Sequence, residues 1–213
     1  MNIQLLIKEC IDEVLSEDYP SSWNKDEFNK IHSYAGKVKY AAQHLQRISS
    51  GSGRVVFIID DTKALKMAKN DRGVAQNEVE VDWGAQDMYG DIVAKIYDFD
   101  EVGYRWIEME LAKKLSMSKF RELTGINDLN EFWEYLQYSG NNHNAEPSKE
   151  LIEKYDNNEF ADRVKSFMLD FDKGYGDLAR LNSYGLVNRN GKESVVIVDY
   201  GLSNQVHKKH YRK

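Results

Sequence analysis

The sequence predicts an α+β protein with two lobes, one of them built on a small antiparallel sheet. Three observations support this class. Helical patterns come first, then about four strand patterns with one helix among them, then further helices and a final β-hairpin. Only two prolines interrupt the 213 residues, and 12% are aromatic, so we expect short connections and ample apolar area for a core.

The elements of the first half follow from hydrophobic spacing. Residues 2–17 and 25–47 place apolar side chains at helical intervals and predict two N-terminal helices. Residues 48–54 are rich in serine and glycine and predict a flexible turn. Strand patterns and one helical pattern follow, with strands at 55–59, 63–69, 92–97 and 104–112 and the helix at 72–88.

The second half is mostly helical. The clearest helices are 128–138 and 159–171, with a polar loop at 139–142 between them. Asn190-Gly191 separates two short strand patterns and is typical of a hairpin turn. We expect one domain, 1–213, with N-terminal helices at 1–47, a sheet lobe at 48–112 and a reduced helical lobe at 113–213, to which the N-terminal helices add.

Composition excludes several classes of protein. No apolar run approaches the roughly 18 residues of a membrane-spanning helix, so we expect a soluble, cytoplasmic protein without a membrane partner. The single cysteine, Cys10, excludes a disulfide framework and a cysteine-based zinc site within one chain. A formal charge of −6 argues against general nucleic-acid binding.

Oxygen-bearing side chains gather around the predicted C-terminal hairpin. Asp177 precedes Asn182 by five residues, and Asp199 follows a buried-looking strand and stands before Tyr200-Gly201. Carboxylate and amide oxygens suit magnesium, which can share them with nucleotide phosphates. An aspartate here could also accept a proton from an attacking hydroxyl. Each residue alone fits a turn or a strand exit, but the joint arrangement favours a functional site.

Two upstream features fit phosphate binding. A glycine- and serine-rich turn before residue 55 offers backbone amides without bulky side chains. Strand alternation places Ala64 and Lys66 on one face, so Lys66 is a candidate phosphate ligand, with a solvated lysine as the alternative. At most one of Glu78 and Glu80 could pair with Lys66, because they point about 200° apart on a helix, and the alternative is that both are solvated.

These residues together resemble the protein-kinase-like superfamily, in particular aminoglycoside phosphotransferases and short bacteriophage kinase-like proteins. Gly176-Asp177 with Asn182 resembles the catalytic loop, and Asp199-Tyr200-Gly201 the metal-binding motif. Ala64-Leu65-Lys66 is similar to the nucleotide-binding strand. Two further segments resemble the nucleotide-covering loop and the adenine-binding hinge, namely Ser50-Gly51-Ser52-Gly53-Arg54 and Met109-Glu110-Leu111-Ala112.

The resemblance implies a bilobal protein-kinase-like fold and a phage-encoded kinase that uses ATP and magnesium in the host cytoplasm. Asp177 would act as base, Asn182 and Asp199 would hold magnesium, and Glu80, favoured over Glu78, would brace Lys66. Loop 50–54 would cover the phosphates, while Ala64, Met109 and the backbone of Glu110 and Ala112 would contact the nucleotide. The favoured acceptor is a serine or threonine of a host protein, with a small molecule as the alternative.

Two other functions stay open. Tyr175 and Ala179 replace a histidine and a lysine that are usual in protein kinases, and residues 202–213 offer no platform for a peptide. These departures favour a pseudokinase-type module that binds nucleotide or a host protein without transfer. A structural role in a virion or scaffold is the third possibility, and it would leave the polar residues without a purpose.

Overall fold

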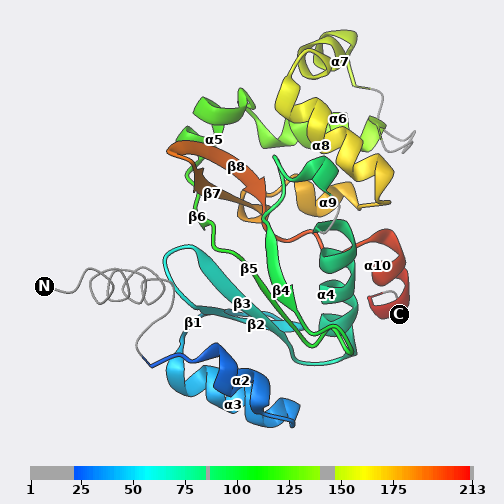
Figure 1. The fold of residues 1–213 in the computed structure, drawn as a ribbon. Coiled ribbons are helices and arrows are strands. Elements are labelled where there is room, and N and C mark those ends of the chain that lie inside the picture. The colour runs from blue at the N-terminus through cyan, green and yellow to red at the C-terminus, as the bar shows by residue number, and fades with distance from the viewer. Residues whose placement is uncertain (1–21, 85–86, 140–146, 212–213) are drawn as a thin grey trace, which may run out of the picture. The chain divides into compact units, whose positions relative to one another are not determined.

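The structure of the chain, a computed structural model, describes residues 22–84, 87–139 and 147–211. It divides into two compact units (Figure 1). Unit 1 comprises Met1–Val74 and Tyr97–Leu111, and unit 2 comprises Ala75–Ile96 and Ala112–Lys213. The α+β class is confirmed, with a small sheet and many helices. The predicted helix 2–17, Cys10 and most of the predicted loop 139–142 lie outside the described residues.

Unit 1 is built on a five-stranded sheet with the strand order β1-β2-β3-β5-β4. The pairs β1–β2, β2–β3 and β3–β5 are antiparallel. The elements are α2 (Lys25–Lys30), α3 (Tyr34–His44), β1 (Gln46–Ser50), β2 (Arg54–Ile58), β3 (Lys63–Ala68), β4 (Ile96–Phe99) and β5 (Trp106–Glu110).

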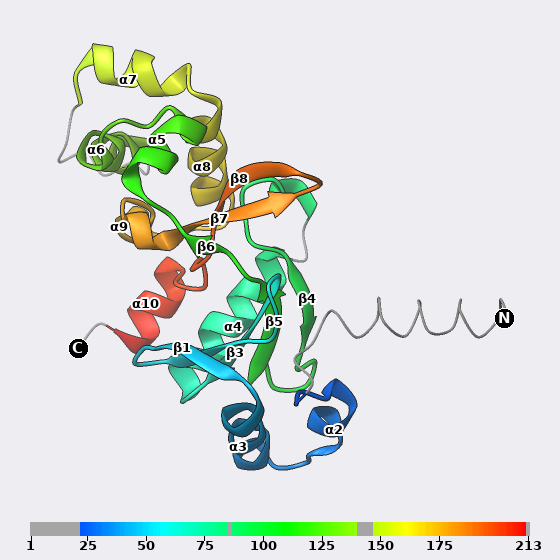
Figure 2. The same cartoon turned by 90° about the vertical axis from the view of Figure 1, so that its left-hand side faces the viewer.

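Strand register gives this sheet two distinct faces. Residues directly opposite each other on antiparallel strands point to the same side. Leu65 lies opposite Phe57 on one neighbour and opposite Glu108 on the other, so these three share a face. That face packs against α2 and α3 in a core of Trp23, Phe28, Ala41, Leu45, Val55, Phe57, Ile59, Leu65, Met67 and Trp106. Figures 1 and 2 both show α2 and α3 together on this side.

The N-terminal helices therefore differ from the prediction in two ways. The stretch 25–47 forms two helices, because Ser33 caps α3 through its side chain, which accepts from the amide of Gly36. The last residues of this stretch instead begin β1, which continues to Ser50 through the first part of the predicted turn 48–54. Both helices belong to the sheet unit rather than to the helical one, since Phe28 is fully buried against Trp106, with ring centroids 5.3 Å apart. Burying such a ring contributes about 2 kcal/mol.

Unit 2 contains most of the helices and a three-stranded sheet with the order β6-β7-β8. It takes helix α4 (Asp71–Gly84) from Ala75 onward, which the sequence had assigned to the sheet lobe. Its other elements are η1 (Asp87–Tyr89), β6 (Lys113–Lys114), α5 (Met117–Thr124), α6 (Leu129–Ser139), α7 (Lys149–Asp156), α8 (Glu159–Asp170), α9 (Tyr175–Leu178), η2 (Leu181–Ser183), β7 (Tyr184–Arg189), β8 (Lys192–Ile197) and α10 (Asn204–His210).

The hairpin β7–β8 forms as its turn residues predict. Asn190 and Gly191 have φ of 55° and 81°, the left-handed values that a two-residue hairpin turn requires. The predicted strand 92–97 is only partly correct. Its first residues lie in unit 2, where Val93 forms a parallel bridge with Ile197, and β4 begins at Ile96.

Aromatic packing anchors the end of this hairpin. Phe167 of α8 is fully buried and contacts the rings of Trp83, Tyr89, Phe171 and Tyr200, at centroid distances of 5.3–6.0 Å. The hydroxyl of Tyr200 also donates to the carbonyl of Ala94 at 3.0 Å. Tyr200 is thus fixed from two directions, and the position of its neighbour Asp199 follows.

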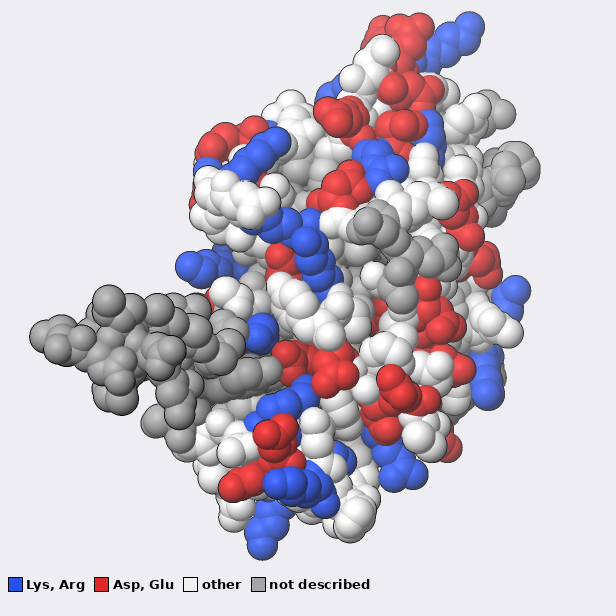
Figure 3. All heavy atoms as spheres, viewed as in Figure 1, with Lys and Arg blue, Asp and Glu red and all other residues white. Residues whose placement is uncertain are grey.

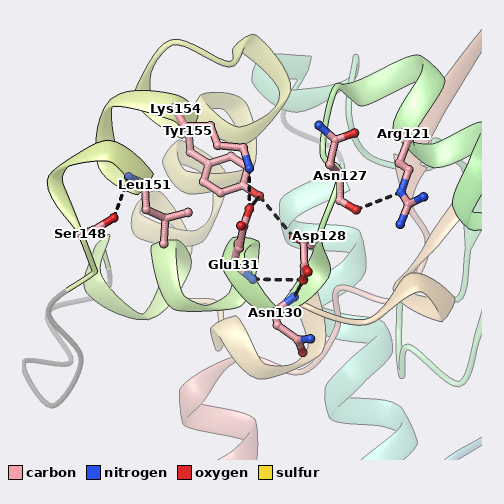
Figure 4. A network of polar contacts seen from close by, with 9 residues as sticks. All are labelled: Arg121, Asn127, Asp128, Asn130, Glu131, Ser148, Leu151, Lys154 and Tyr155. Atoms are coloured by element: carbon pink, nitrogen blue, oxygen red, sulfur yellow. Dashed lines mark hydrogen bonds and ion pairs between the residues drawn. The ribbon is translucent and has the colours of Figure 1, made fainter.

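A polar network ties α6 to α7 (Figure 4). The carboxylate of Asp128 accepts from the amide of Asn130 at 2.7 Å and so caps α6. Glu131 pairs with Lys154 at 2.5 Å and accepts from the hydroxyl of Tyr155 at 3.3 Å. Burial, together with the charge of Glu131, raises the pKa of Tyr155. These contacts are structural, since they satisfy a buried hydroxyl.

The exposed surface carries charges of both signs. Figure 3 shows acidic and basic side chains interspersed on the visible surface of each unit, as is typical of a solvated exterior. Among the helices of the described ranges, none is long and apolar enough to cross a membrane.

Candidate functional site

The candidate residues of unit 1 share the sheet face that points away from α2 and α3. Lys66 lies opposite Val56 and Ile107, Ala64 lies opposite Met109, and Arg54 lies opposite Ala68. Alternation therefore puts Arg54, Ala64, Lys66 and Met109 on one face, as predicted for Ala64 and Lys66. Lys66 and Arg54 are only 7% and 8% exposed. Two buried cations on one sheet face suit an anionic ligand.

The glycine- and serine-rich turn joins β1 to β2, and its shape is fixed by the segment after β3. Within the turn, the amide of Gly51 donates to the carbonyl of Arg54 at 2.9 Å. The side chain of Lys69 donates to the carbonyl of Gly51 at 2.9 Å, and that of Asn70 to the carbonyl of Ser52 at 2.9 Å. The amide of Lys69 donates to the carbonyl of Gly53 at 2.7 Å. Several independent bonds hold the turn.

Along the sequence, the predicted hinge spans the boundary between unit 1 and unit 2. Met109 belongs to the site face of unit 1, whereas Glu110 lies opposite Lys63, and alternation turns its side chain to the face of α2 and α3. Ala112 belongs to unit 2, where it lies beside Gly185: a Cβ at Gly185 would come within 2.4 Å of the Ala112 methyl group. Within unit 1, Met109 and Glu110 therefore direct their side chains to opposite faces of the sheet.

In unit 2 the predicted oxygen ligands gather at the open end of the β7–β8 hairpin. Tyr184 lies opposite Ile197, and the amide of Val198 donates to the carbonyl of Ser183 at 2.8 Å. Asn182 and Asp199 are the next residues on the two sides, and both are exposed. The hydroxyl of Ser183 donates to the carbonyl of Asp177 at 2.6 Å, which attaches α9 to the same end.

Of the two candidate glutamates, Glu80 is buried and Glu78 is exposed. The Glu80 carboxylate accepts from the amide of Gly201 at 3.2 Å. Gly201 approaches α4 so closely that a Cβ there would lie 2.4 Å from the carbonyl oxygen of Gln76. A glycine is needed at 201 for this contact, and Glu80 fixes the chain two residues after Asp199.

A residue that the sequence did not single out lies among these acids. Lys173 stands between α8 and α9 and is 2% exposed. Its ammonium group donates to the carbonyl of Leu202 at 3.0 Å and lies 3.5 Å from a carboxylate oxygen of Asp177. Burial lowers the pKa of Lys173, and the carboxylates of Asp177, Asp199 and Glu80 oppose this effect. No periodicity marks Lys173, because it follows a turn rather than a regular element.

The side-chain oxygens of Asn182 and Asp199 could supply part of the coordination shell of a magnesium ion. In the described part of the chain, no group of three or more His, Cys, Asp or Glu side chains could hold a metal ion by itself. Asn182 and Asp199 offer one amide and one carboxylate, and magnesium commonly completes such a set with water and phosphate oxygens. These two residues could therefore hold magnesium together with a bound nucleotide.

Comparison with known proteins gives distant structural neighbours. No protein-family model and no curated protein matches the chain. A streptomycin–ATP–APH(2″)-IIa ternary complex matches with a TM-score of 0.38 and 11% sequence identity. The match covers 80% of this chain and 71% of the APH(2″)-IIa chain. ADP-bound aminoglycoside phosphotransferase APH(2″)-Ib has a TM-score of 0.34 and 14% identity, covering 79% and 70%. At such low scores and identities, nothing about this chain's ligands follows from them.

Proposed function

We propose that the chain is a magnesium-dependent phosphotransferase that moves the γ-phosphate of ATP to a hydroxyl acceptor. The observation that supports it best is the gathering of Asp177, Asn182 and Asp199 at one end of the β7–β8 hairpin. That end combines a half-buried carboxylate with two exposed oxygen ligands. Phosphoryl transfer needs this combination, because its catalysis consists of positioning and charge neutralisation.

The residues of unit 1 would hold the nucleotide. In this proposal Lys66 contacts the α- and β-phosphates, and Arg54 with the turn 50–53 covers them. Ala64 and Met109 contact the base from the same sheet face, and backbone groups of Glu110 and Ala112 complete the adenine contacts. Glu80 is the brace that we assign to Lys66. Its burial supports the choice of Glu80 over Glu78.

The residues of unit 2 would handle the metal and the acceptor. Asn182 and Asp199 would hold magnesium, which when bound neutralises charge on the phosphates. Asp177 would accept the proton of the acceptor hydroxyl as its oxygen bonds to the γ-phosphorus and the bond to the β-phosphate oxygen breaks. Asp177 is 30% exposed at its side chain, so an acceptor can reach it. ADP and a phosphate ester are the products.

For the acceptor we favour a serine or threonine hydroxyl of a protein, with a small molecule as the alternative. This choice, like the suggestion that the chain is phage-encoded and acts in the host cytoplasm, rests on the sequence resemblance. A labelled-ATP assay with host-cell extract, read for labelled protein and for labelled small molecules, separates the two acceptors.

Nucleotide binding is the direct test. MgATP should raise the melting temperature, because a ligand that binds only the native state stabilises it by mass action. Lys66→Met should weaken MgATP binding about 10- to 100-fold, as expected when a charged hydrogen bond to phosphate is lost. Lys63→Met is the matched control, because Lys63 lies on the same strand with its side chain on the other face.

The outcomes separate the candidate functions. No thermal shift with wild type at millimolar MgATP would reject the phosphotransferase. A shift without any ADP formation, with or without extract, would favour the pseudokinase-type module. An equal loss of affinity in both lysine variants would remove Lys66 from the site.

A further inference from the structure

Lys173 is a buried charged group that the proposed mechanism does not use. Its side chain is 0% exposed, and lysines are almost never fully buried unless they are paired. The lysine stands four residues before Asp177, outside any helix or strand of the described chain. Its role in the inference below rests on the proposed function, since it concerns the placement of the proposed base.

The backbone around Lys173 is fixed on both sides. Asp172 has φ of 49°, a left-handed conformation that non-glycine residues seldom adopt. Asn204 holds it there: its amide donates to the carbonyl of Asp172 at 3.0 Å, and its side chain donates to the Asp172 carboxylate at 2.9 Å. Lys173 itself forms an isolated antiparallel bridge with Ser203. The chain thus reverses sharply after α8, and Lys173 is directed into the protein.

The Lys173 ammonium group contacts two segments that carry candidate site residues. It bonds to the carbonyl of Leu202, three residues after Asp199, and it forms an ion pair with Asp177. The carboxylates of Asp199 and Glu80 also interact with its charge. The ammonium group thus pairs with one acid, Asp177 of α9, and its charge is also favoured by acids from α4 and from the segment after β8. A buried charge of this kind is tolerated when its partners surround it.

We propose that Lys173 is a positioning residue that ties Asp177 to the segment 199–203. The tie has two parts, an ion pair to the proposed base and a hydrogen bond to the backbone that follows the proposed metal ligand. It fixes the distance between base and metal ligand before any nucleotide binds. Lys173 does not touch the acceptor or the phosphates, and it acts only through Asp177 and Leu202.

The first measurement needs no nucleotide. In Lys173→Met, amide hydrogen exchange should rise about tenfold or more in 175–183 and 199–204, because loss of the tie permits local opening. Exchange in the α6–α7 region should stay as in wild type. Lys165→Met is the matched control, since Lys165 also pairs with two carboxylates of unit 2, those of Asp156 and Asp162. It should leave exchange in 175–183 and 199–204 unchanged.

The second measurement is ATP hydrolysis, with water as acceptor, in a double-mutant cycle. Lys173→Met should lower kcat about 100-fold, as for a base displaced by about an ångström, with KM for MgATP within about threefold. In the Asp177→Asn background, Lys173→Met should cause no further loss, because both changes remove one function. Lys173→Arg keeps the charge and should recover kcat to within about tenfold of wild type.

The exchange and the kinetic results test two different parts of the proposal. Unchanged exchange in 175–183 and 199–204 of a folded Lys173→Met protein overturns the tie, whether or not the protein binds nucleotide. Additive kcat losses in the cycle overturn its action through Asp177. If Lys173→Met does not fold, exchange and the cycle are measured with Lys173→Gln, which keeps a hydrogen-bond donor but loses the ion pair to Asp177. Unchanged local exchange or additive kcat losses in that variant then overturn the proposal. Failure of wild type to bind MgATP rejects the phosphotransferase and leaves the exchange result to decide the tie.

Discussion

Unit 1 and unit 2 place their candidate site residues by different means. In unit 1 the positions follow from sheet register: Lys66, Ala64 and Met109 share a face because β3 and β5 alternate and pair. In unit 2, Asp177 and Asp199 lie outside strands. Individual contacts from Ser183, Lys173 and Glu80 hold Asp177 and the segment after Asp199. In a sheet, many backbone hydrogen bonds together fix the position of a side chain. In unit 2, a few individual side-chain contacts fix each candidate residue. Single substitutions should therefore act more strongly in unit 2.

The largest effect is expected at Asp177. Asp177→Asn should lower phosphoryl transfer about 10²- to 10⁴-fold, the usual contribution of a general base, with MgATP affinity nearly intact. Asp199→Asn should instead weaken magnesium-dependent binding, because it removes a charged oxygen ligand from a hard cation. Both side chains are at least partly exposed, so both variants should fold. Titration of MgATP, followed by ADP release with one acceptor, distinguishes them.

If Asp177→Asn lost nucleotide affinity as strongly as Asp199→Asn, the two residues would serve one purpose, and the division between base and metal ligand would be wrong. Normal transfer by both variants would remove the hairpin end from the catalytic site.

The next largest effect on turnover is expected at Glu80, with Glu78 of the same helix as the comparison. Glu80→Gln keeps an oxygen acceptor for the amide of Gly201 but loses the charge that interacts with Lys173. Turnover should fall about 10- to 100-fold, the range for a charged hydrogen bond. Glu78→Gln should change turnover and stability little, since Glu78 is exposed. ADP release and denaturant unfolding of both variants provide the check, and equal losses would reverse the assignment.

A smaller effect is expected in unit 1, where the bonds to the glycine-rich turn are redundant. Lys69→Met removes the side-chain bond to the carbonyl of Gly51. The bonds from the amide of Lys69 to Gly53 and from Asn70 to Ser52 remain. Losing one neutral-acceptor bond of several should cost about 1 kcal/mol or less, or at most about fivefold in MgATP affinity. A loss as large as that of Lys66→Met would show that the turn has no redundancy.

The contrast between units also explains what could be predicted from sequence. Two-residue alternation correctly placed Ala64 and Lys66 on one face, and the Asn190-Gly191 signal correctly predicted the hairpin, because both depend on local geometry. Helical spacing also showed that only one of Glu78 and Glu80 could face inward, and the structure buries Glu80. The roles assigned to these residues stay predictions.

What sequence missed depends on contacts between distant segments. Nothing local shows that Phe28 packs on Trp106, so the N-terminal helices were assigned to the wrong unit. Residues 92–94 read as a strand of the main sheet, but tertiary pairing joins them to β8. Nothing local in the sequence marks Lys173, because its burial follows a backbone reversal at Asp172 that Asn204 stabilises from 32 residues away.

The smallest expected effect separates general loosening of unit 2 from loss of the Lys173 tie. Hydrogen bonds from Lys165 and Tyr135 hold the pKa of Asp156 below its usual range. A lowered folded-state pKa adds stability that is present above about pH 4 and is lost as pH falls through the folded-state value. The Asp156 side chain is 47% exposed, so solvent screening limits the contribution to about 1 kcal/mol or less.

Asp156→Asn should therefore unfold at slightly lower denaturant than wild type at pH 7, and the difference should shrink as pH falls below about 4 toward the lowered pKa of folded Asp156. Its turnover at pH 7 should match wild type, because α7 carries none of the residues bonded to Lys173 in the contacts described above. Denaturant curves at several pH values and one ADP-release assay suffice. A variant that lost turnover in proportion to its small loss of stability would show that unit 2 responds as a whole, and the bond-by-bond account of its site would then be wrong.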